Sequence, residues 1–141
     1  MSDLVITAAN VKASDKAKKR TGKFGATVTQ GQTVYEDTSA NSAFKLADNN
    51  GASAAITSKC AGIALNAGAN GQDAIIVESD PEFTPGGTLS VGESYYLSAT
   101  PGGLCPVSDV NTSGMYPVFL LVAYSTTQGN LQIVRGSSPK P

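Results

Sequence analysis

An internal repeat restricts the fold of this chain more than any other feature of its sequence. Three pairs of segments carry the match: residues 31–35 with 92–96, 62–65 with 121–124, and 73–77 with 130–134. In the first pair Gly31 aligns with Gly92 and Tyr35 with Tyr96. A repeat of this length indicates duplicated supersecondary units that share one core. Chance similarity is the alternative, because strand and turn segments draw on few residue types.

Short strands bounded by turn residues predict the fold class. Phe44 and Leu46 alternate with polar or small neighbours, which is the period of a half-buried strand. Pro101-Gly102 has the residue order of a type II turn. Many such strands at even spacing are typical of a β-sandwich or small barrel. We therefore predict an all-β protein: a small antiparallel β-barrel or sandwich built from two similar β units, with an extended N-terminal arm.

The same pattern sets the expected boundaries. An arm covers residues 1–23, a single β domain covers 24–136, and a tail covers 137–141. The domain has two similar halves, about 24–80 and 88–136, joined by a Pro/Gly-rich linker over 81–87. Residues 52–59 are the one stretch where a short helix is expected, because it is rich in Ala.

The N-terminal arm combines an apolar run with basic charge. Residues 12–23 hold six of the ten basic side chains and show no apolar periodicity, so an isolated helix is not expected there. Two interpretations stay open: a solvated arm, or an arm that becomes ordered against an acidic partner surface. On the second interpretation we predict these partner-binding residues: Leu4, Val5, Ile6, Lys12, Lys16, Lys18, Lys19 and Arg20.

The sequence offers no recognisable reactive constellation. It has no His, which is the commonest general base and metal ligand, and no Gly-x-Ser-x-Gly or P-loop pattern. Residues 48–51 resemble the start of a calcium loop but lack its closing Glu, so a turn is favoured. Asp80 and Glu82 flank a Pro and are expected to be solvated. We predict no catalytic residues, no cofactor and no metal.

Charge and cysteine content restrict the partners and the compartment. Net charge is −1 and only 15% of residues are charged, against roughly 25% in an average domain, so neither nucleic acid nor a membrane is an expected partner. The longest apolar run, 116–124, is too short to span a bilayer, and the N-terminus does not resemble a signal peptide. In a cytosol, Cys60 and Cys105 are expected to be free and buried. Tyr95 and Tyr96 are expected to face opposite sides of a strand.

Two runs resemble a known class of proteins: residues 44–48 with 61–66, and the run 92–106, which contains Tyr-Tyr-Leu-Ser-Ala-Thr-Pro-Gly. Both are similar to head decoration (capsid cement) proteins of tailed bacteriophages, over about residues 25–134. The resemblance implies a non-enzymatic virion protein, made in the host cytoplasm, that binds the major capsid protein on the outer capsid surface. It also favours a homotrimer. The alternatives are a tail or fibre component that binds a host glycan, and a cytosolic enzyme of unknown type.

Overall fold

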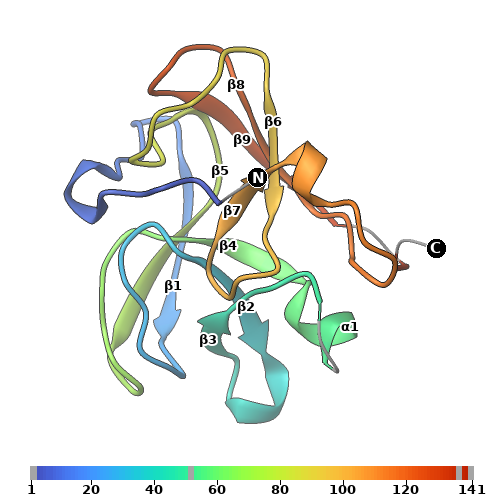
Figure 1. Cartoon of the computed structure of the whole chain (residues 1–141). Helices are drawn as coiled ribbons and strands as arrows, with labels where there is room; N and C mark the ends of the chain where they lie inside the picture. Colours follow the sequence, from blue (N-terminus) through green and yellow to red (C-terminus); the bar gives the residue numbers. More distant parts are fainter. Residues whose placement is uncertain (1–2, 51–52, 136–137, 140–141) are drawn as a thin grey trace.

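The computed structural model describes residues 3–50, 53–135 and 138–139. Within these ranges the fold is almost entirely β (Figure 1). The elements in chain order are η1 (Ala8–Asn10), β1 (Lys18–Lys23), β2 (Thr33–Asp37), η2 (Thr38–Ala40), β3 (Ala43–Leu46), α1 (Ala54–Thr57), β4 (Cys60–Ala64), β5 (Asp73–Phe83), β6 (Ser94–Leu97), β7 (Leu104–Pro106), η3 (Val107–Asp109), β8 (Phe119–Ala123) and β9 (Gly129–Val134). The all-β prediction is confirmed, and the short helix falls inside the predicted 52–59.

The strand order of the sheet reads the same from both ends. Its path is β3-β2-β4-β5-β9-β8-β6-β7, every pair is antiparallel, and β1 pairs with β5 off this path. The half β3-β2-β4-β5 therefore corresponds to β7-β6-β8-β9. Tyr35 lies on β2 and Tyr96 on β6, which are equivalent strands, as the repeat predicts.

Irregularities in the register repeat as well. The β2–β4 pair shifts register between Val34 and Tyr35, and the β6–β8 pair shifts between Tyr95 and Tyr96. One detail of the sequence match is wrong. Ile63 and Val122 are equivalent residues of the repeat. Ile63 pairs with Val77, and Val122 pairs with Asn130. Asn130 therefore corresponds to Val77, although the sequence match aligned it with Asp73. Short apolar runs match each other at several registers, and only the neighbouring strand selects one.

Strand β5 belongs to both halves. Its first part, residues 73–79, pairs with β1, while residues 79–83 pair with β9. In the second half, residues 79–83 pair with β9. They therefore hold the position that β1 holds in the first half, where β1 pairs with residues 73–79. We call β1–β4 with residues 73–77 the first unit, and residues 79–83 with β6–β9 the second unit. The expected linker over 81–87 is wrong for residues 81–83, which continue β5.

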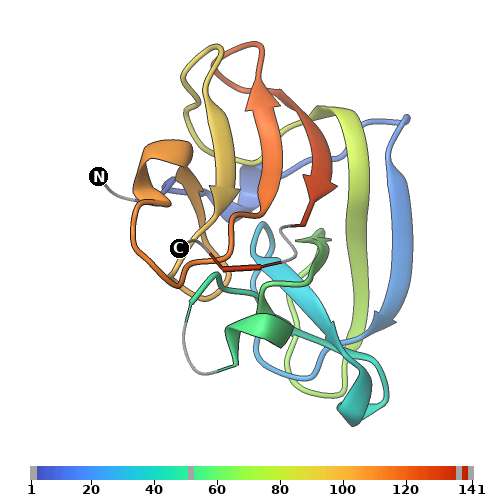
Figure 2. The same cartoon turned by 90° about the vertical axis from the view of Figure 1, so that its right-hand side faces the viewer.

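The chain start is not a separate arm, which corrects the predicted boundary at residue 23. Lys18–Lys23 forms β1 and runs beside β5 (Figure 2). Before it, the N-terminal segment, residues 3–17, lies mainly on the second unit and also contacts the turn at Gly31, just before β2. Lys12 exchanges both backbone hydrogen bonds with Thr84, at 2.9 and 3.0 Å, and Val11 is 3% exposed. Backbone pairing with Thr84, just after the end of β5, and burial of apolar side chains hold the segment, although its sequence lacks apolar periodicity. Met1 and Ser2 lie outside the described residues.

Two apolar clusters and one turn complete the body. Phe24 and Phe44 belong to a cluster inside the first unit, whereas the larger cluster joins both units through residues such as Ile63 and Leu121. The turn between β6 and β7 has Gly102 at φ +83°, as the Pro-Gly prediction requires. The Gly102 N–H donates to the carbonyl of Ala47 at 2.8 Å, so the sheet curls until its outer hairpins meet. Of the expected tail 137–141, only residues 138–139 are described.

Candidate functional site

An open cleft of about 950 Å³ lies where the N-terminal segment crosses the second unit. Its walls come from four parts of the chain: the N-terminal segment, residues 84–88, the β8–β9 turn, and the β6–β7 hairpin. Tyr95 and Pro106 represent that hairpin in the lining. Tyr95 is only 4% exposed, and its hydroxyl accepts a hydrogen bond from the N–H of Ser90 at 3.0 Å. The cleft is therefore held by elements that also build the core.

The cleft occupies a seam that is closed in the first unit. There the Gly25 N–H donates directly to the Phe44 carbonyl at 2.8 Å, and the Phe44 ring is 1% exposed. Gly86 and Leu104 are the equivalent residues of the second unit, but they do not meet. Thr7 N–H donates to Gly86 and Leu4 N–H donates to Leu104, at 2.9 and 2.8 Å. The N-terminal segment thus separates the two sides of the second seam.

Most of the polar side chains in the described cleft lining are uncharged. Thr7, Asn10, Thr88 and Thr127 line it, and their side chains make no hydrogen bond within the described part of the chain. Among the described residues, the lining contains one acid and one base, Asp3 and Lys12. Asp3 already accepts a hydrogen bond from the Ser98 hydroxyl at 2.6 Å. The described part of the lining therefore presents free hydroxyl and amide groups, and its one acid and one base balance in charge.

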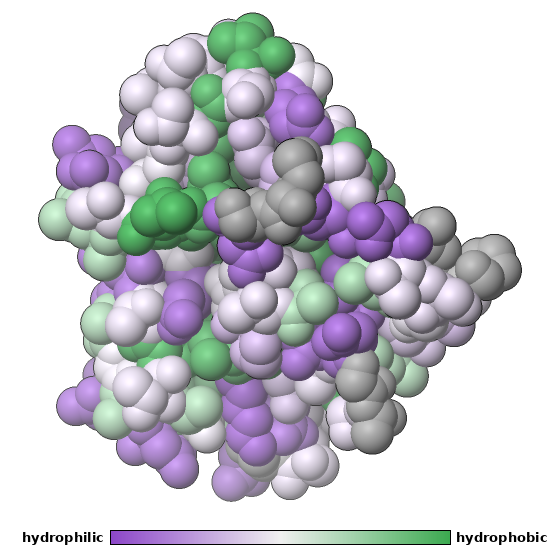
Figure 3. All heavy atoms as spheres, in the orientation of Figure 1, coloured by the Kyte–Doolittle hydropathy of each residue, from purple (hydrophilic) through white to green (hydrophobic). Residues whose placement is uncertain are grey.

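An aliphatic surface adjoins these groups. Val5 lines the cleft and is 82% exposed, the highest value among the large exposed hydrophobic residues of the described chain. Figure 3 shows apolar atoms gathered over the N-terminal segment on this face, with polar atoms around them. Leu4 and Ile6, on either side of Val5, are partly buried and pack on the larger core cluster. Only Val5 of the predicted apolar run is free to contact a partner.

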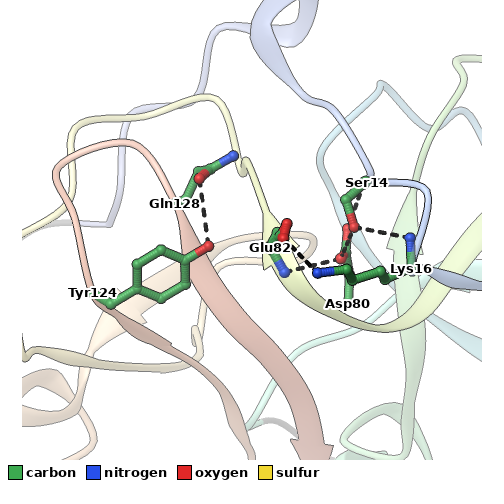
Figure 4. A network of polar contacts seen from close by, with 6 residues as sticks. All are labelled: Ser14, Lys16, Asp80, Glu82, Tyr124 and Gln128. Atoms are coloured by element: carbon green, nitrogen blue, oxygen red, sulfur yellow. Dashed lines mark hydrogen bonds and ion pairs between the residues drawn. The ribbon is translucent and has the colours of Figure 1, made fainter.

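A polar network lies beside the cleft (Figure 4). Asp80 is fully buried, so the expectation that it is solvated is wrong. Its carboxylate accepts hydrogen bonds from the Ser14 N–H at 2.7 Å, from the Ser14 hydroxyl, and from the Glu82 N–H at 3.0 Å. Lys16 pairs with Glu82 at 3.0 Å, and this hydrogen bond and charge raise the pKa of Lys16. Asp80 therefore fastens the N-terminal segment to β5.

A second group of polar contacts lies at the cleft, around Gln128 (Figure 4). Its amide nitrogen donates to the Thr84 hydroxyl, and its oxygen accepts from the Tyr124 hydroxyl, each at 3.4 Å. The Tyr124 ring is 48% exposed, and partial burial followed by the negative charges of Glu82 and Asp80 raises the pKa of its hydroxyl. An exposed aromatic ring therefore stands next to one wall of the cleft.

The structure divides the eight predicted partner-binding residues between two places. Leu4, Val5, Ile6 and Lys12 lie at or near the cleft, whereas Lys16, Lys18, Lys19 and Arg20 run along β5. The acidic surface met by the second group belongs to the chain itself. Lys18 approaches Glu78 at 4.0 Å, Arg20 approaches Glu36 at 3.4 Å and Glu78 at 3.7 Å, and Lys23 pairs with Asp73. Lys12 and Lys19 make no ion pair within the described ranges.

The two thiols and the potential metal-ligating side chains form no reactive cluster among the described residues. Cys60 and Cys105 are free and buried, as predicted, and burial raises the pKa of each thiol to about 12. No three potential metal-ligating side chains come together in the part of the chain that is described. No helix among the described residues has the length and apolar character needed to cross a membrane.

In sequence comparisons, no protein-family model matches the chain, and no curated protein matches it.

Proposed function

We propose that this chain is a non-enzymatic structural protein of a tailed bacteriophage, which binds the outer surface of the capsid and stabilises it as a decoration or cement protein. The observation that carries the proposal is the doubled, symmetric sheet with the chain start fastened along β5. Such a body presents fixed surfaces and has few long charged side chains to order on contact. The similarity of residues 92–106 to phage structural proteins supports the same conclusion.

The major capsid protein is the proposed partner, and a homotrimer is the proposed assembly. Each copy needs little affinity alone, because many contacts act together on a closed lattice. Oligomers are usually symmetric, and a trimer fits a three-fold position of a shell. We propose no nucleic-acid or membrane partner, and a location on the virion after synthesis in the host cytoplasm.

The outer edge of β1 is the proposed capsid contact. One edge of β1 pairs with β5, and no other strand pairs with residues 18–21 within the described chain. Lys18 and Lys19 are exposed there. Lysines on an edge oppose the addition of another strand, so the contact is made by side chains. Exposed ion pairs contribute only about 0–1 kcal/mol each, so binding should weaken as salt is raised.

Co-sedimentation with empty heads of the parent phage tests this proposal. We expect the protein to saturate the heads, and electron microscopy of virions should show it on the outer capsid surface. Lys19→Glu should weaken binding, whereas Lys59→Glu, at another exposed lysine, should not. Location on the tail, or absence from virions, would overturn the proposal. Equal binding by both variants would place the contact elsewhere on the body.

The alternative of a glycan-binding tail or fibre component predicts an exposed aromatic platform. Most described rings do not provide one. Tyr35 and Tyr95 are 9% and 4% exposed, and Tyr96 packs edge-on against Phe119 with ring centroids 5.7 Å apart. Tyr124 is the exception, and it stands alone beside the cleft.

A further inference from the structure

The two units differ at the seam that holds the cleft in the second unit, although the rest of the repeat is shared. In the first unit the rings of Phe24 and Phe44, each 1% exposed, fill the seam, and a Cβ added at Gly68 would come within 2.7 Å of the Phe24 ring. In the second unit Pro85 and Leu104 stand at the equivalent positions, and the seam holds the cleft of about 950 Å³. Pro85 and Leu104 are both buried, and the cleft lies where the N-terminal segment crosses between the two sides of this seam.

The size and position of this opening suit a ligand site. Binding pockets commonly occupy roughly 300–1,000 Å³ and often lie at the mouths of β-barrels. The Cβ positions of Gly86 and Gly87 would contact the backbone oxygens of Thr7 and Val5 at 2.8 and 2.5 Å, so glycines permit the close crossing that forms this wall. Close backbone packing therefore fixes this part of the wall, and side chains complete the lining.

The chemistry of the wall selects the ligand class. Four free hydroxyl or amide side chains, those of Thr7, Asn10, Thr88 and Thr127, face a space bordered by aliphatic Val5. An anionic ligand would meet Lys12 but also Asp3, and a purely apolar ligand would leave the hydroxyl groups without partners. A neutral sugar has hydroxyl edges and apolar C–H faces, which match both parts of the wall. Tyr124, beside Gln128, adds the one exposed ring among the described residues.

We propose that the cleft between the N-terminal segment and the second unit is a binding site for a neutral oligosaccharide. The hydroxyl edges of the sugar would bond to Thr7, Thr88 and Thr127, with an apolar face on Val5. This site does not overlap the outer edge of β1. The proposal is independent of the capsid role, because it concerns the isolated protein and its cleft.

A titration of the full-length ¹⁵N-labelled protein, followed by NMR, tests the proposal. The probes are four neutral trisaccharides: maltotriose, cellotriose, mannotriose and triacetylchitotriose. We expect at least one of them, at millimolar concentration or below, to shift the amide resonances of Thr7, Thr88 and Thr127 in a saturable way. Shifts in none of the four titrations, or shifts only at residues away from the cleft, would overturn the proposal.

Matched threonine variants locate the site. Thr88→Val and Thr127→Val keep the shape of the side chain but remove a hydroxyl, and each should weaken binding about two- to tenfold. The control is Thr27→Val, because Thr27 is the equivalent of Thr88 in the first unit and is exposed. It should bind like the wild type. Unchanged affinity in both cleft variants would overturn the proposal even if the sugar binds.

An uncharged peptide of alternating Ser and Val serves as the competing probe, because an extended polypeptide also carries polar and apolar groups. Saturable shifts of the cleft resonances by this peptide, with none by the sugars, would make the cleft a polypeptide-docking site and overturn the saccharide assignment. Failure of the saccharide test leaves the head-binding experiment unaffected, so the two proposals fail separately.

Discussion

Gly31 and Gly92 hold the same position in the two units. The Gly31 N–H donates to the Ala64 carbonyl at 2.8 Å, and the Gly92 N–H donates to the Ala123 carbonyl at 2.7 Å. Both have positive φ, +96° and +83°, which L-residues rarely adopt. Their surroundings differ, because a Cβ on Gly31 would meet Val11 at 2.8 Å whereas a Cβ on Gly92 would meet nothing within 4 Å. The N-terminal segment thus packs on only one of two equivalent turns.

This difference predicts unequal costs for one substitution. Gly92→Ala should lower the free energy of unfolding by about 1–2 kcal/mol, the cost of a left-handed L-residue. Gly31→Ala should lower it by about 2–5 kcal/mol, because overpacking against Val11 and Ile6 adds about 1–3 kcal/mol. Urea unfolding of both variants measures the difference. Equal costs would show that the N-terminal segment does not press on Gly31.

Two valines test whether the N-terminal segment is part of the folded core. Val11 is 3% exposed and Val5 is 82% exposed, although both lie in the same segment. Val11→Ala should cost about 1–3 kcal/mol of stability, and Val5→Ala should stay within about 0.5 kcal/mol. The measurement is again the urea midpoint. A negligible effect of Val11→Ala would restore the interpretation of the segment as a solvated arm.

Asp80 should contribute more to stability than a neighbouring exposed acid. Asp80→Asn replaces a buried carboxylate that accepts hydrogen bonds from Ser14 and Glu82, so we expect a loss of about 1.5–3 kcal/mol. The control, Asp15→Asn, is exposed and should change stability by less than about 0.5 kcal/mol. Thermal or urea unfolding compares the two. Similar small effects would show that the segment is held without this carboxylate.

The thiols should be free yet unreactive in the native protein. The thiolate is the nucleophile, and burial raises the pKa of Cys60 and Cys105 to about 12. Iodoacetamide at neutral pH should therefore label neither residue in the folded state, and both after unfolding without reductant. Mass spectrometry reads the two results. An unlabelled pair after unfolding would indicate a disulfide, and labelling before unfolding would indicate exposed thiols.

The sequence predicts the doubled fold because turn glycines and paired tyrosines are local signals. Gly31 and Tyr35 identify the first unit, and Gly92 and Tyr96 identify the second. Strand β1 cannot be predicted in this way, because Lys18–Lys23 has no apolar alternation. Its strand state comes from pairing with β5, whose paired residues lie fifty or more positions away along the chain.

The burial of Asp80 and the cleft were also beyond local reasoning. Asp80 is buried because Ser14, 66 residues earlier, donates to it. Equivalent positions differ, with Phe44 in one unit and Leu104 in the other, and the cleft forms where the N-terminal segment separates the two sides of the second seam. A comparison of the two repeats in the sequence can show that Leu104 stands where the first unit has Phe44. The path of the N-terminal segment required the structure.

Acid should weaken the fold through Asp37, which ends β2. Hydrogen bonds from Lys45 at 2.8 Å and from Ser39 lower the pKa of Asp37 from 3.8 to about 2. A carboxyl whose pKa is lower in the folded state stabilises the fold above its ordinary pKa, and this contribution is lost as the pH falls from about 4 through about 2. Lys45→Met should raise the pKa of Asp37 toward its ordinary value. It should also reduce the change of stability between about pH 4 and about pH 2. The control, Lys59→Met, is at an exposed lysine and should leave the pKa of Asp37 unchanged. A carbon-detected NMR titration of the Asp37 carboxyl, with urea midpoints at each pH, gives both quantities. A wild-type pKa near 3.8 would show that the Lys45–Asp37 pair does not hold in solution.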